Sequence, residues 1–260
     1  MTESLEQYRY EVKFVCPHEA RDRFDLWLRY APESFSRSYQ DRVVNNVYFD
    51  TLGLRDFADN VIGLPARLKT RLRWYGDTAA PRSMVLEYKI KSGRINRKHS
   101  VPLPGLDLAK TTWRELADLL SAHAEHRFCA VASYFKNPVL RNRYRRQYYV
   151  TRGHRVRMTV DADLTYYDAA ASPMVVGVGM GLKTTSQVIE FKGTVERAHD
   201  LERLLRRIPL RLSRNSKYVM GVDRMRVRDA TTSIGQRRSA KPTEASTAAD
   251  GVRAFRPKWT

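Results

Sequence analysis

Apolar and charged residues alternate with a period of two along many short segments of the chain. In VLEYKIK, residues 85–91, apolar side chains alternate with glutamate and lysine. Such alternation is typical of an extended strand with one apolar and one charged side. Turn-forming pairs such as Ser92–Gly93 and Arg152–Gly153 separate several of these segments. Strands are predicted over residues 8–15, 43–50, 66–76, 83–91, 96–103, 139–151, 154–168 and 186–193.

Three segments carry helical periodicity instead. Phe24, Trp27 and Leu28 form one stripe in residues 18–30, and similar stripes predict helices over residues 111–127 and 195–208. These stripes are interpreted as core contacts without chemistry. About eight antiparallel strands with few helices predict a mainly β fold, either a sandwich or a closed barrel.

The C-terminal region changes character near residue 229. The stretch DATTSIGQRRSAKPTEASTAADG is low in apolar residues and rich in small polar ones. Such a composition cannot bury enough apolar surface to order the chain. We therefore expect one domain over residues 1–228, followed by a basic, disordered tail over residues 229–260.

The charge balance of the chain bears on its function. The 260 residues contain 47 Lys+Arg and 28 Asp+Glu, a formal net charge of +19. Nine Lys/Arg and three Asp/Glu lie in residues 224–260, so the other +13 belongs to residues 1–223. The basic excess is thus a property of the folded domain. It indicates a polyanionic partner: nucleic acid, an anionic membrane surface or a phosphate-rich small molecule.

Cysteine content and hydropathy bear on the compartment. Two cysteines, Cys16 and Cys129, suggest a reducing environment without a disulfide framework. The first residues show no apolar signal-peptide core, and no run approaches the roughly 18 apolar residues that span a bilayer. A soluble, cytoplasmic protein is therefore expected.

Charged and polar residues recur in pairs two positions apart, which places both members on one side of a strand. The intervening positions are apolar, as at Leu72, Trp74 and Phe191. A single strand of this kind usually has its charged side in water, yet here arginine and lysine dominate strand after strand. Closing the sheet with this side inward would create a cationic tunnel, held together by a bound polyanion and a bridging metal ion. The pairs are Glu11/Lys13, Arg71/Arg73, Glu87/Lys89, Asn96/Lys98, Tyr144/Arg146, Arg155/Arg157/Asp161 and Glu190/Lys192.

Seven short motifs occur in a recognisable order and spacing. They are YEVKF, RLRWYG, LEYKIKSG, YRRQYY, VRMTVD, IEFKG and SRNSKYVMGV. Together they resemble the VTC (vacuolar transporter chaperone) polyphosphate polymerase domain over roughly residues 8–223. That domain belongs to the triphosphate tunnel metalloenzymes, together with the CYTH group of adenylate cyclases and thiamine triphosphatases.

The resemblance implies a closed, eight-stranded antiparallel β-barrel with flanking helices, whose tunnel holds a triphosphate. Position by position, it implies catalytic roles for Lys13, Arg71, Arg73, Lys89, Arg146, Arg157 and Lys217. It implies substrate binding by Tyr144, Ser216 and Lys98. It implies metal binding chiefly by Glu190, with Glu87 and Glu11 as further ligands.

One departure from the CYTH pattern bears on the reaction. The CYTH motif is E-x-E-x-K, and Arg9 occupies the place of its first glutamate. Fewer carboxylates make a second metal ion less plausible, and a phosphohydrolase can use such an ion to activate water. The expected enzyme is therefore an ATP-dependent polyphosphate polymerase, a phosphotransferase that passes the γ-phosphoryl group to a growing chain.

Two alternatives remain open. The first is a tunnel-type tripolyphosphatase or nucleoside triphosphatase with the same cations and metal. The second is a non-catalytic binder of polyphosphate or nucleic acid. Nucleic-acid binding would need exposed aromatic residues interleaved with cations, whereas Trp74, Tyr88 and Phe191 fall on the apolar side of their strands. Nucleic acid is therefore not the expected partner.

The resemblance also implies cofactors and partners. Mn²⁺ or Mg²⁺ is the expected cofactor, and ATP and polyphosphate are the expected ligands. Whether the enzyme acts alone or beside a membrane protein that exports the chain is left open; such a partner would associate this cytoplasmic protein with the inner face of a membrane.

Overall fold

The computed structural model describes residues 9–93, 95–124, 128, 133–154, 156–177, 179–194, 198–213 and 215–239. The chain divides at Met225 into two units, Met1–Met225 and Arg226–Thr260. The first unit contains the sheet and every site residue discussed below. The last helix continues into the second unit as far as Ser239. The domain boundary expected after residue 228 stays a prediction, and residues 240–260 of the expected tail lie outside the described residues.

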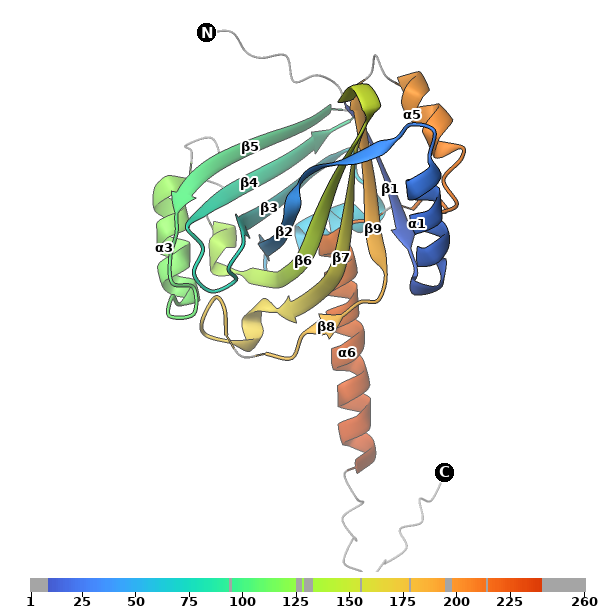
Figure 1. The fold of residues 1–260 in the computed structure, drawn as a ribbon. Coiled ribbons are helices and arrows are strands. Elements are labelled where there is room, and N and C mark those ends of the chain that lie inside the picture. Colours follow the sequence, from blue (N-terminus) through green and yellow to red (C-terminus); the bar gives the residue numbers. More distant parts are fainter. Residues whose placement is uncertain are drawn as a thin grey trace, which may run out of the picture. The chain divides into compact units, whose positions relative to one another are not determined.

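The first unit is built on one antiparallel sheet, as predicted (Figure 1). Its strands run in the order β1-β9-β7-β6-β2-β3-β4-β5, and the short β8 pairs with β7. All eight predicted strands are found, and β2 begins eight residues earlier than predicted. The strands are β1 Arg9–Cys16, β2 Phe35–Phe49, β3 Ala66–Tyr75, β4 Ser83–Ser92, β5 Ile95–Pro104, β6 Pro138–Thr151, β7 Val156–Asp168, β8 Leu182–Lys183 and β9 Gln187–Thr194.

The sheet curls, but backbone hydrogen bonds do not close it. β1 and β5 lie at the two ends of the strand order, and no pairing joins them among the described residues. The expected closed barrel is therefore not confirmed. The mainly β, antiparallel part of the expected fold class is confirmed: the described part of the chain has one sheet of nine strands and five α-helices.

Five helices accompany the sheet: α1 Arg21–Tyr30, α2 Arg55–Ile62, α3 Trp113–His123, α5 Ala198–Leu205 and α6 Lys217–Ser239. α1, α3 and α5 were predicted, while residues 125–127 and 195–197 of their expected spans lie outside the described residues. The sequence pattern missed α2 and α6. In the part of the chain that the structure describes, no helix is both long and apolar enough to cross a membrane.

Two of the three apolar cores cover the outer face of the sheet. One joins α3 to β2, β3 and β4 through buried residues such as Trp74, Leu86 and Leu116. The other joins α1 and α5 to β7 and β9 through residues such as Phe24, Phe191 and Leu204. These side chains occupy the apolar strand positions of the sequence, so the predicted apolar face is confirmed. The charged positions must then lie on the opposite face, called the concave face below.

The start of α6 packs against one end of the concave face. The ring of Tyr218 stacks on Tyr48 with centroids 5.1 Å apart, and its hydroxyl donates to the carboxylate of Asp50. Gly221 allows this approach, because a Cβ there would overlap Leu140 and lie 2.8 Å from a ring carbon of Tyr166. The packing places the first residues of α6 beside the charged strands.

Candidate functional site: a cationic face of the sheet

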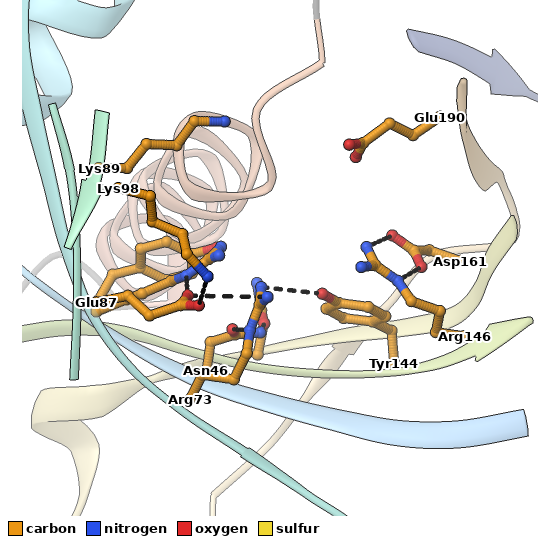
Figure 2. Close-up of polar contacts among 12 residues, drawn as sticks. Asn46, Arg73, Glu87, Lys89, Lys98, Tyr144, Arg146, Asp161 and Glu190 are labelled. Carbon is orange, nitrogen blue, oxygen red and sulfur yellow. Dashed lines mark hydrogen bonds and ion pairs between the residues drawn. The ribbon is translucent and has the colours of Figure 1, made fainter. Parts of the chain in front are cut away.

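The concave face carries charged side chains from β1, β3, β4, β5, β6, β7 and β9 and from α6. Strand pairing places them on one side: Arg71 is opposite Glu87, Lys13 is opposite Glu190, and Arg146 is opposite Asp161. The structure therefore brings together most of the residues that the sequence predicted as a site. The polar contacts on this face fall into three groups. Figure 2 shows two of them, one around Glu87 and one between Arg146 and Asp161, with Tyr144 between the two.

The first group surrounds Glu87 on β4. Its carboxylate lies 2.6 Å from Nε of Arg71, 3.8 Å from Arg73 and 3.0 Å from Nζ of Lys98. Burial alone would raise the pKa of Glu87, but the three cations lower it to about 2. Arg73 also donates to Oδ1 of Asn46 at 2.8 Å. Glu87 thus holds three cations in place, and both of its carboxylate oxygens take part in these ion pairs.

The second group is centred on Asp161 of β7, which is fully buried. Arg146 donates to both carboxylate oxygens, at 2.6 and 2.8 Å, and Nζ of Lys217 lies 2.5 Å from Oδ2. Burial would raise the pKa of Asp161, yet Lys217 and Arg146 hold it below the ordinary value. Asp161 therefore fixes one cation from the sheet and one from α6.

Tyr144 connects these two groups. Its side chain is buried, and its hydroxyl accepts a hydrogen bond from Arg73 at 3.5 Å. Nζ of Lys217 lies 4.8 Å from its ring centroid. Because the hydroxyl accepts from Arg73, its own proton remains available for a phosphate oxygen.

The third group lies on β1 and β9. Nζ of Lys13 is 2.6 Å from Glu11 and 4.0 Å from Glu190, and Nζ of Lys192 is 2.6 Å from Glu190. Burial would raise the pKa of Glu190, but Lys13 and Lys192 lower it below the ordinary range. Lys89 reaches the same group from β4, with its Nζ 3.6 Å from Glu11.

Lys69 on β3 belongs to the site although the sequence interpretation left it out. Its Nζ donates to Oγ of Ser216 at 3.1 Å, which explains how the predicted residue Ser216 joins the concave face. Burial, with Lys13 and Lys89 nearby, lowers the pKa of Lys69 to about 7. The signal was present in the sequence, because Lys69 continues the parity of Arg71 and Arg73 along the same strand.

Other members of the face show the same pattern. Lys192 lies two positions from Glu190, and Asp161 four positions from Arg157, so both point to the same side of their strands as those predicted residues. Asn46 lies opposite Arg73 on the neighbouring strand. Asn46 could not be found from charge, because its role as an acceptor for Arg73 depends on strand pairing. Arg157, predicted as catalytic, lies on this side of β7 opposite Lys192, but it is exposed.

The carboxylates fit a particular mode of metal binding. Among the described residues, no cluster of three or more His, Cys, Asp or Glu side chains is arranged to hold a metal ion. Glu190 and Glu11 lie on adjacent strands and interact electrostatically. Mg²⁺ and similar hard ions commonly use one or two carboxylates together with substrate phosphates. Glu190 and Glu11 form such a pair on adjacent strands, although each also contacts a lysine, Lys192 and Lys13 respectively. The oxygens of Glu87 contact Arg71 and Lys98.

The fold and site define a class of protein: an antiparallel β protein with helices on the outer face of its sheet and basic residues across the inner one. The VTC domain family model matches residues 8–226. The chain therefore belongs to the VTC domain family, and the resemblance seen in the sequence is confirmed.

Comparisons with individual proteins add little to this family assignment. No curated protein matches the chain. One similar solved structure is a putative adenylyl cyclase, HpAC1 from Hippeastrum, described as having a dominant triphosphatase activity. It is 19% identical, with a TM-score of 0.44, over 80% of this chain and 92% of that chain. A likeness at this level does not bear on function.

Proposed function

We propose that the concave face binds the triphosphate of ATP, and that the protein is a metal-dependent polyphosphate polymerase. One observation carries the proposal. Arg73 from β3 donates to the hydroxyl of Tyr144, while Arg146 from β6 and Lys217 from α6 lie 5.4 and 4.8 Å from the centroid of its ring. Cations outnumber carboxylates on this face, so a polyanion would complete its charge balance.

Each predicted residue has a defined part in this proposal. The basic side chains would neutralise phosphate oxygens: Lys13, Arg71, Arg73, Lys89, Arg146, Arg157 and Lys217. Tyr144 would donate a hydrogen bond from its hydroxyl to a phosphate oxygen. Ser216 and Lys98 would contact the ends of the ligand. Asp161 and Glu87 keep the arginines aimed inward before the ligand arrives. Such pre-organisation matters because phosphoryl transfer depends mostly on positioning and electrostatics.

Glu190, with Glu11 beside it, would hold Mn²⁺ or Mg²⁺ on the β1–β9 side of the face. When bound, such an ion neutralises charge on the reacting phosphates. The terminal oxygen of a polyphosphate chain would attack the γ-phosphorus, the bond to the β–γ bridging oxygen would break, and ADP would leave. Lys13 and Lys192 would then stabilise the charge that moves between phosphates.

The carboxylate count favours transfer to a chain over transfer to water. Arg9 stands where the CYTH pattern has its first glutamate, which leaves fewer carboxylates for a second ion. A phosphate chain end is already anionic and needs little activation, whereas water does. The alternative with the same binding residues is a tripolyphosphatase or nucleoside triphosphatase.

Product analysis of the purified protein with ATP and Mn²⁺ tests this proposal. The polymerase should yield chains visible on a stained gel, with ADP formed in step. Arg146→Ala should abolish chain growth, while Lys110→Ala, which removes an exposed cation from the connection between β5 and α3, should not. Orthophosphate without chains would establish the hydrolase instead. Salt-sensitive polyanion binding without turnover would establish the non-catalytic binder.

A further inference from the structure

A group of aromatic side chains surrounds one arginine at the edge of the cationic site. The guanidinium of Arg42 lies 5.7 Å from the ring centroid of Tyr39 and 5.8 Å from those of Tyr75 and Tyr148. The rings of Tyr39 and Tyr148 meet edge to face, with centroids 5.6 Å apart. This tyrosine group (Tyr39, Arg42, Tyr75 and Tyr148) draws on β2, β3 and β6.

Strand pairing places the tyrosine group on the concave face, directly beside the phosphate-binding cations. Arg42 is opposite Arg146 in the β2–β6 pairing, and Tyr39 is opposite Tyr148. Tyr148 follows Arg146 by two positions on β6, as Tyr75 follows Arg73 on β3. Two positions along a strand keep the side and advance by about 6.6 Å. Tyr75 and Tyr148 are therefore each the next residue on this face beyond an arginine of the proposed triphosphate site, and Tyr39 lies opposite Tyr148.

Packing does not account for these rings. Tyr39 is 63% exposed and Tyr75 is 42% exposed, and neither belongs to the three apolar cores. Isolated exposed tyrosines are ordinary on a protein surface. Three tyrosines around one arginine, continuous with a cationic face, are a different case, because they present π surfaces beside a site for anions.

We propose that the tyrosine group binds the base of a nucleoside triphosphate whose phosphates occupy the cationic site. This inference rests on the proposed function and names the part of the substrate that the function leaves unassigned. A base has a flat π face that stacks on tyrosine rings, and Arg42 adds a cation beside the same rings. A polyphosphate chain has no π face, so the rings would gain little from it.

Binding of ATP and of inorganic tripolyphosphate to the full chain, measured by titration calorimetry, tests the inference. The variant Tyr39→Leu/Tyr75→Leu removes two exposed rings while keeping apolar bulk, so folding should survive. We expect its ATP affinity to fall at least tenfold, because stacking contributes on the order of tenfold per ring. Its tripolyphosphate affinity should stay within about twofold. Tyr39→Phe/Tyr75→Phe keeps the rings and should recover most of the ATP affinity.

A matched control is Tyr30→Leu, which removes a 74% exposed tyrosine on α1 and should leave both affinities unchanged. Equal loss of ATP and tripolyphosphate affinity in the double leucine variant would overturn the inference, as would no loss of either. Tighter binding of a single-stranded oligonucleotide than of ATP, lost with the same rings, would also overturn it. If wild-type protein bound neither ATP nor tripolyphosphate, the proposed function itself would fall.

Discussion

Glu11 on β1 meets Lys89 on β4, with the carboxylate oxygen 3.6 Å from Nζ. In the strand order, β9, β7, β6, β2 and β3 all lie between these two strands. The contact therefore crosses the concave face from side to side. It shows that the sheet curls far enough for opposite walls to touch through side chains, although β1 and β5 do not pair.

The first prediction concerns this contact. Glu11 also lies near Lys13 and Lys192, so Glu11→Gln takes one counter-ion from three lysines, of which Lys13 and Lys192 keep Glu190. We expect the ligand-free variant to unfold at a lower temperature, by the equivalent of about 1 kcal/mol or less, because these side chains are partly exposed. Tripolyphosphate should restore much of the loss, since bound ligand at a hundredfold excess over Kd adds about 2.7 kcal/mol. Thermal unfolding with and without ligand checks both effects. An unchanged melting temperature in every condition would contradict the assigned contacts.

The second prediction concerns the buried carboxylate of Asp161. Asp161→Asn leaves Arg146 and Lys217 without their counter-charge, and breaking a buried ion pair typically costs about 3–5 kcal/mol. Asp163→Asn is a matched control on the same strand, because its pairing with Arg145 is exposed and should cost about 1 kcal/mol or less. Denaturant unfolding of both variants gives the comparison. Equal, small losses would mean that Asp161 does not anchor these cations.

The third prediction is a pH dependence that comes from Lys69. Its pKa of about 7 makes it mostly neutral at pH 8, and a bound triphosphate should favour the charged form. Binding at pH 8 should therefore take up nearly one proton through Lys69, and Lys69→Arg, which stays charged, should take up correspondingly less. Calorimetry in two buffers of different ionisation enthalpy measures the uptake. Lys13, Lys89 and Arg71 also act on Lys69 and are unchanged in the variant. With the same ligand for both proteins, the difference in proton uptake therefore reports Lys69. Identical uptake would rule out this role.

The fourth prediction separates the metal from the cations. Glu190→Ala removes the main proposed metal ligand and leaves the basic side chains in place. Tripolyphosphate affinity should persist or rise, because a negative charge beside the ligand is gone, while turnover should collapse. Lys13→Ala should weaken both binding and turnover, since a charge-assisted hydrogen bond contributes about 1.5–3 kcal/mol. A Glu190→Ala protein that builds chains at the normal rate would place the metal elsewhere.

Much of this arrangement follows from strand parity in the sequence. The alternation around Glu87 and Lys89 predicted both the strand and the side on which its charges lie. The same rule could have included Lys69, which the motif comparison passed over. Parity is a local property, so it needs no knowledge of which strands are neighbours.

Other features depend on contacts that parity does not specify. The first half of β2 has register shifts between Arg37 and Arg42, which break the simple alternation and hide the tyrosine group. The curl of the sheet is set by packing of distant segments, so the sequence could not show whether β1 and β5 would pair. The start of α6 was missed because its role depends on contacts of Lys217 and Tyr218 with β2 and β7.

The most direct test of the central claim is a crystal structure of the protein with tripolyphosphate and Mn²⁺, using the anomalous signal of manganese to locate the ion. We expect phosphate density beside Tyr144, within hydrogen-bonding distance of Arg73, Arg146 and Lys217, and a manganese peak next to Glu190. Phosphate density on the outer face of the sheet, or a manganese peak remote from both Glu190 and Glu11, would contradict the account.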